Sequence, residues 1–142
     1  MKKALIIVGS HHAGKSRTIN RHLKSALGIS AKANKFSEKD LYGTGSANKS
    51  YGWIYSQSIE ERGRKTPWIA EFASNSKWQR LVFSARPIGE PVSHYKTLKE
   101  ELEKAGYKVE TIDIVKTLGT DGMYDDKCYY KAKGAEALQA LR

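Results

Sequence analysis

The chain contains little cysteine and no long apolar run. Cys128 is the only cysteine among 142 residues, which excludes a disulfide framework and a cysteine-based metal site and favours a reducing, cytoplasmic setting. The longest apolar run is far shorter than the roughly 20 residues of a membrane span, so we expect no membrane association. The basic and apolar start resembles a secretory signal, but it continues into a glycine-containing loop instead of a cleavage site, and we reject that interpretation.

Internal repeats and interdomain linkers are also missing, and the sequence predicts one domain over residues 1–142. The formal net charge is +10, and the basic residues are spread along the chain without a pronounced block. A basic surface attracts polyanions such as nucleic acid. A site for a triphosphate, magnesium and an anionic second substrate would also require basic residues, and the composition leaves both interpretations open.

One phosphate-binding motif is present near the N-terminus. The pattern G-x-x-x-x-G-K-[ST] is matched without a gap. An apolar run at residues 4–8 precedes it, as expected for a buried parallel strand. A segment with Ile19, Leu23 and Leu27 at helical spacing follows it. The residues predicted to surround phosphate are Gly9, Ser10, His11, His12, Ala13, Gly14, Lys15, Ser16 and Arg17.

Each residue type in this motif has a physical role. Gly9 and Gly14 permit backbone angles that let successive N–H groups converge on one anion. The positive end of the following helix adds a favourable field. Lys15 would place its charge against the phosphates, and the hydroxyl of Ser16 would bind Mg²⁺, which prefers oxygen ligands.

Through the segment GSHHAGKS the chain resembles the P-loop NTPase superfamily. The resemblance covers the first fifth of the chain. It implies that Gly9, Gly14 and Lys15 contact phosphate, that Ser16 contacts magnesium, and that the ligand is a nucleoside triphosphate.

The remainder of the chain alternates between predicted strands and helices. This order predicts an α/β fold with three α/β/α layers and a mostly parallel central sheet of about four to five strands, similar to P-loop NTPases. Residues 37–50, which are rich in Gly, Ser and Asn, are expected to form an exposed loop. Further strands are predicted at 51–55, 80–85 and 108–115, and helices near 59 and at 67–74, 93–105 and 129–141.

An acidic magnesium ligand at the end of a second apolar strand is missing from the pattern. The run at 51–55 ends in Ser56 and Gln57, and Asp113 lies inside a predicted strand. Gln57 or Glu60 would therefore have to orient the attacking group or a magnesium-bound water. Without such a group the site would bind a nucleotide and turn it over slowly or never, because charge neutralisation and metal-held water provide much of the catalysis in phosphoryl transfer.

Arg86 directly follows the strand at 80–85, and its guanidinium has the geometry to bind the transferring phosphoryl group. Arg62 and Arg64 lie in a polar segment that would either close over substrate or face solvent. His11 and His12 occupy the variable positions of the motif and lack the spaced partners of a metal site. The predicted catalytic residues are therefore Lys15, Arg86, Gln57 and Glu60.

The guanine-reading motif N-K-x-D is absent, which makes ATP the default ligand. The first hypothesis is a small magnesium-dependent phosphotransferase or ATPase that acts on an unidentified acceptor. The second is a nucleotide-gated binding protein with a nucleic acid or another polyanion as its partner. A third is a nucleic-acid-processing ATPase that works as an oligomer.

Overall fold

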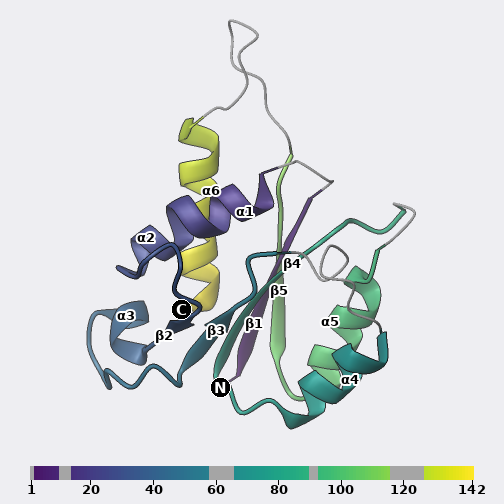
Figure 1. The fold of residues 1–142 in the computed structure, drawn as a ribbon. Coiled ribbons are helices and arrows are strands. Elements are labelled where there is room, and N and C mark those ends of the chain that lie inside the picture. Colours follow the sequence, from purple (N-terminus) through teal and green to yellow (C-terminus); the bar gives the residue numbers. More distant parts are fainter. Residues whose placement is uncertain (1, 10–13, 58–65, 90–92, 116–126) are drawn as a thin grey trace, which may run out of the picture.

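The computed structural model describes residues 2–9, 14–57, 66–89, 93–115 and 127–142. Five strands form one sheet in the order β2-β3-β4-β1-β5 (Figure 1). Strands β3, β4, β1 and β5 are parallel, and β2 pairs antiparallel with β3. Their bounds are β1 (Lys3–Val8), β2 (Lys35–Phe36), β3 (Gly52–Ile54), β4 (Arg80–Ala85) and β5 (Lys108–Asp113).

Helices cover both faces of the sheet. One face carries α6 (Lys127–Leu141) and a continuous helix made of α1 (Lys15–Arg17), the π-helical segment η1 (Thr18–Leu23) and α2 (Lys24–Ala26). The other carries α4 (Thr66–Asn75) and α5 (Tyr95–Lys104), and Figure 1 shows the two groups on opposite sides. Among the described residues, no helix is long and apolar enough to span a membrane.

The central strands are apolar at nearly every position because helices cover them on both sides. In β1, Leu5 and Ile7 pack toward α6, and Ala4 and Ile6 pack toward α4 and α5. All six residues of β4 are buried. The continuous apolar runs therefore predicted the two strands at the centre of the sheet correctly.

The predicted α/β class and mostly parallel sheet are confirmed, with differences at the ends of several elements. The predicted strand at 108–115 ends at Asp113, and the predicted helix at 93–105 starts at Tyr95. The N-cap residue of α5 is His94, and the hydroxyl of the preceding Ser93 donates to the carbonyl of Arg86 at 2.8 Å. The expected helix near residue 59 lies outside the described residues.

Residues 37–50 are not entirely a loop, because α3 (Glu38–Tyr42) begins there. The Ser37 hydroxyl accepts from the amide of Asp40, and the Asp40 carboxylate accepts from the amide of Ser37. This reciprocal capping satisfies two amides that the helix leaves unpaired. The glycine-rich composition of the segment concealed this start signal, and Gly43 ends the helix at a φ of 81°.

Arg80 joins the start of β4 to the C-terminal end of the chain. It is 4% exposed, and its guanidinium donates to the carbonyl of Leu141 at 2.6 Å and to the hydroxyl of Tyr42 at 2.7 Å. Its charge also lies 5.3 Å from the centre of the Tyr51 ring. Arg80 therefore links β4, α3 and α6 in one buried network.

We expect Arg80→Met to lower the free energy of unfolding by about 2–4 kcal/mol, because it leaves buried oxygen atoms without donors. Arg142 provides a matched control, since it also bonds a carbonyl near the same end of α3, that of Leu41 at 2.9 Å, but is exposed. Arg142→Met should cost about 1 kcal/mol or less. Urea denaturation of both variants measures the difference, and equal losses would contradict the role given to Arg80.

Candidate phosphate-binding site

The predicted phosphate-binding motif lies where β1 ends and α1 begins. The amide of Gly9 donates to the carbonyl of Ala85 at 3.1 Å, so the chain leaves the sheet still attached to β4. Lys15 is 5% exposed, and its ammonium group donates to the carbonyl of Gly9. This contact joins Lys15 to Gly9, the first residue of the motif. Ser10, His11, His12 and Ala13 lie outside the described residues.

Gly14 has a backbone conformation that disfavours a side chain. Its φ is 104°, and a Cβ atom there would lie 2.5 Å from Cε1 of Tyr130. The carbonyl of Gly14 accepts from both the amide and the hydroxyl of Thr18, at 2.9 Å each. Arg17 lies over the Tyr130 ring at 5.6 Å. The first helical turn and α6 therefore hold this glycine from two sides.

Three oxygen-bearing residues meet beside the motif. The hydroxyl of Ser16 donates to the carbonyl of Ser56 at 3.2 Å, and the hydroxyl of Ser84 donates to the same carbonyl at 3.3 Å. Ser56 follows β3, and Ser84 is the fifth residue of β4. Ser56 and Ser84 therefore lie beside Ser16 of the motif.

The site contains no carboxylate among the residues that the structure describes nearby. Ser84, completely buried, occupies the end of β4 beside β1. Asp113 does end a strand next to β1, in register with Val8, but its side chain is exposed. Neighbouring Ile112 packs with the core on the α6 side, so strand alternation directs Asp113 away from the face that carries α1. No cluster of three or more His, Cys, Asp or Glu side chains occurs within the described ranges.

The other predicted site residues have different positions. Arg86 directly follows β4, at the same end of the sheet as the carboxyl end of β1, and it is half-buried. Gln57 is exposed and follows Ser56. Glu60, Arg62 and Arg64 lie outside the described residues. The structure thus brings five of the predicted residues to the carboxyl ends of the central strands: Gly9, Gly14, Lys15, Ser16 and Arg86.

A second lysine is buried on the same helix as Lys15. Lys24 is 1% exposed, and its ammonium group donates to the carbonyl of Ala31 at 2.9 Å and to Oδ1 of Asn34 at 3.4 Å. Burial lowers the pKa of Lys24 below the ordinary lysine value. These two hydrogen bonds hold residues 31–34 against the helix. No pattern in the sequence predicted this role for Lys24.

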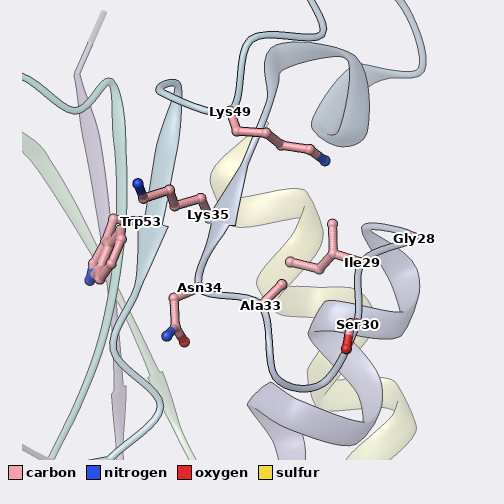
Figure 2. Close-up of a pocket in the computed structure, with 8 residues that line it drawn as sticks. All are labelled: Gly28, Ile29, Ser30, Ala33, Asn34, Lys35, Lys49 and Trp53. Atoms are coloured by element: carbon pink, nitrogen blue, oxygen red, sulfur yellow. The ribbon is translucent and has the colours of Figure 1, made fainter.

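A cavity of about 570 Å³ lies between α2 and the edge of the sheet at β2 and β3. Figure 2 shows Lys35 and Trp53 together on one side of it and Ile29 and Ala33 on the other. The ammonium group of Lys35 lies 5.6 Å from the Trp53 ring, and Nε1 of Trp53 is buried without a hydrogen-bond partner among the described residues. The sequence did not predict this cavity, because it depends on how residues 28–35 lie against Lys49 and Trp53.

Comparisons with protein-family models, with curated proteins and with solved structures give no match to this chain.

Proposed function

We propose that the chain binds a nucleoside triphosphate, with ATP as the first candidate, through the loop between β1 and α1. The observation that carries the proposal is the contact between the Lys15 ammonium group and the Gly9 carbonyl. In this contact a buried cation lies beside Gly9, the residue at which the predicted phosphate-binding motif begins. A triphosphate would offer this cation a charged acceptor in place of a neutral carbonyl, which is a stronger hydrogen bond.

The arrangement around the loop also supports the proposal. Gly14 precedes the first turn of α1, and the first intrahelical bond runs from the amide of Thr18 to the carbonyl of Gly14. The amides before Thr18 in this turn have no intrahelical acceptor and point out of the helix end. Anions are stabilised at such an end by unpaired N–H groups and by the helix dipole. Arg86 adds a permanent charge at the same edge of the sheet.

The described residues of this site offer Mg²⁺ only neutral oxygen atoms as ligands. Ser16, Ser56 and Ser84 contribute two hydroxyls and one carbonyl. Mg²⁺ is usually held by one or two carboxylates together with substrate phosphates and water. The described residues therefore suit Mg²⁺ that arrives with the triphosphate, where it would neutralise phosphate charge, with Ser16 as its protein ligand.

We further propose that the protein is a small phosphotransferase or ATPase in which Lys15 and Arg86 stabilise the transferring charge, with Gln57 and Glu60 as candidates to orient the attacking group. The alternative is a nucleotide-gated binding protein with slow turnover, which is favoured because no described residue near the motif is a carboxylate. Calorimetric titration with Mg²⁺ and ATP, followed by a phosphate-release assay, separates the three outcomes. Saturable binding with turnover supports the enzyme, binding without turnover supports the alternative, and no binding at millimolar nucleotide contradicts both.

Ser84→Asp tests whether a cation binds beside residue 84, because the substitution introduces a carboxylate at that position. A carboxylate at this buried position would lack a partner, and we expect the free energy of unfolding to fall by about 1–3 kcal/mol without ligand. Adding Mg²⁺ and ATP should recover part of this loss, because the new carboxylate would gain a cation. Ser84→Asn is the control of equal size, and its melting temperature should show no extra gain from Mg²⁺. If the two variants respond alike to Mg²⁺ with ATP, no cation is bound beside residue 84.

A further inference from the structure

The net positive charge of the chain comes mainly from residues 1–37, which contain no acidic residue. Residues 1–37 contain eight Lys and Arg residues and no Asp or Glu, whereas the remaining 105 residues contain 17 basic and 15 acidic residues. Most of the net charge of +10 therefore comes from the first quarter of the chain. The basic residues themselves form no pronounced block. The excess of positive charge in residues 1–37 arises because this segment contains no Asp or Glu.

Part of this segment forms one surface with α6. Gly134 on α6 lies against η1, since a Cβ atom at Gly134 would be 2.5 Å from Cβ of His22. Arg17 lies over the ring of Tyr130 one turn earlier in α6. The pKa of His22 is lowered by burial and then by the charges of Arg21, Arg17 and Lys131, so all three cations lie near His22. We call Arg17, Arg21 and Lys131 the η1–α6 basic face.

Two cations of this face, Arg21 and Lys131, have no acidic partner among the residues that the structure describes. Both side chains are exposed. Other exposed lysines do pair with acids, as in Lys49 with Asp40 and Lys108 with Glu110.

The described parts of α1, η1, α2 and α6 hold one acidic residue, Glu136, and it pairs with Lys133 at 3.4 Å.

We propose that the η1–α6 basic face binds the phosphate backbone of a nucleic acid strand. Exposed cations that lie close together, as Arg21 and Lys131 do near His22, release counterions from a polyanion, which drives binding without reading sequence. Tyr130 is buried and Tyr129 is half-buried, so this face would bind phosphates and would not stack bases.

The chemistry of the face favours nucleic acid over a lipid surface. Binding at a membrane interface adds buried apolar area to electrostatic attraction. The large exposed apolar residues in the described ranges are Tyr42, Ile88 and Val115, and none of them lies on α1, η1, α2 or α6. The proposal does not depend on nucleotide binding, and its test contains no nucleoside triphosphate.

The test is fluorescence anisotropy with a labelled single-stranded RNA of about 20 nucleotides, at salt concentrations from about 50 to 200 mM. The double variant Arg21→Glu/Lys131→Glu should bind about tenfold more weakly or worse. The slope of log affinity against log salt should become shallower by about 1.4, since each phosphate contact on a single strand contributes about 0.7.

Lys77→Glu/Lys96→Glu is the matched control. Both lysines are exposed, neither has an ion pair among the described residues, and the change in net charge is the same. This control should keep the affinity and the salt slope of the wild type. Arg21→Gln/Lys131→Gln should give an intermediate loss, and circular dichroism checks the fold of each variant.

Three results would overturn the proposal. The first is no binding of the RNA by the wild type at about 50 mM salt. The second is an equal loss in both glutamate variants, which would mean that affinity follows net charge and not this face. The third is binding of wild type, but not of Arg21→Glu/Lys131→Glu, to phosphatidylserine vesicles in the absence of RNA binding, which would assign the face to a lipid surface.

Discussion

Lys15→Met should weaken ATP binding by about 100-fold or more while leaving the fold intact. The substitution keeps the length of the side chain and removes the ammonium group that contacts Gly9. A charge-assisted hydrogen bond to phosphate in a buried position contributes about 2–3 kcal/mol, and neighbouring phosphate charge adds to that. The unliganded protein loses one hydrogen bond and one buried charge, so its free energy of unfolding should change by about 1 kcal/mol or less. Calorimetry and urea denaturation measure the two effects.

Lys24→Met is the control for this prediction. Lys24 is also a buried lysine on the same continuous helix, and its ammonium group also donates to a backbone carbonyl. It lies outside the proposed nucleotide site, so Lys24→Met should retain ATP affinity within about twofold of the wild type. If both variants lose affinity equally, the loss comes from general damage to the helix and Lys15 has no specific role.

Gly14→Ala should both destabilise the protein and weaken nucleotide binding. The φ of 104° is unfavourable for alanine, and the added methyl group would lie 2.5 Å from the Tyr130 ring. We expect a loss of about 2–4 kcal/mol in the free energy of unfolding, from backbone strain and from the steric conflict together. The displaced first turn of α1 should lower ATP affinity at least about tenfold, because its amides would no longer converge on the phosphates.

Gly28→Ala separates strain from steric conflict. Gly28 also has a positive φ, of 73°, but a Cβ atom there would meet nothing within 4 Å. Gly28→Ala should therefore cost only about 1 kcal/mol and leave ATP affinity unchanged. Equal destabilisation of the two variants, measured by urea denaturation, would show that Tyr130 does not restrict residue 14.

The sequence predicted those parts of the fold that local patterns determine. The apolar runs at 4–8 and 80–85 identified β1 and β4, because strands covered on both faces have no polar alternation. The short β2, only two residues long, has no detectable period and was missed. The helix α3 was missed as well, although Ser37 and Asp40 form a recognisable capping pair.

Tertiary relationships could not be predicted in this way. The sequence gives no order for the strands, and so it does not show that the end of β4 lies beside β1. The bond from Arg80 to Leu141 joins residues 61 positions apart. The contact of Tyr130 with Gly14 likewise depends on where α6 packs, and no local pattern encodes it.

The most direct test of the nucleotide-binding proposal is an NMR titration of ¹⁵N-labelled protein with Mg²⁺ and a non-hydrolysable ATP analogue. We expect the backbone amides of Gly9, Gly14, Lys15 and Ser16 to shift together and to saturate, because phosphate oxygens would accept hydrogen bonds from this loop. An absence of amide shifts at millimolar analogue would contradict the proposal, as would shifts confined to the residues that line the cavity near Trp53.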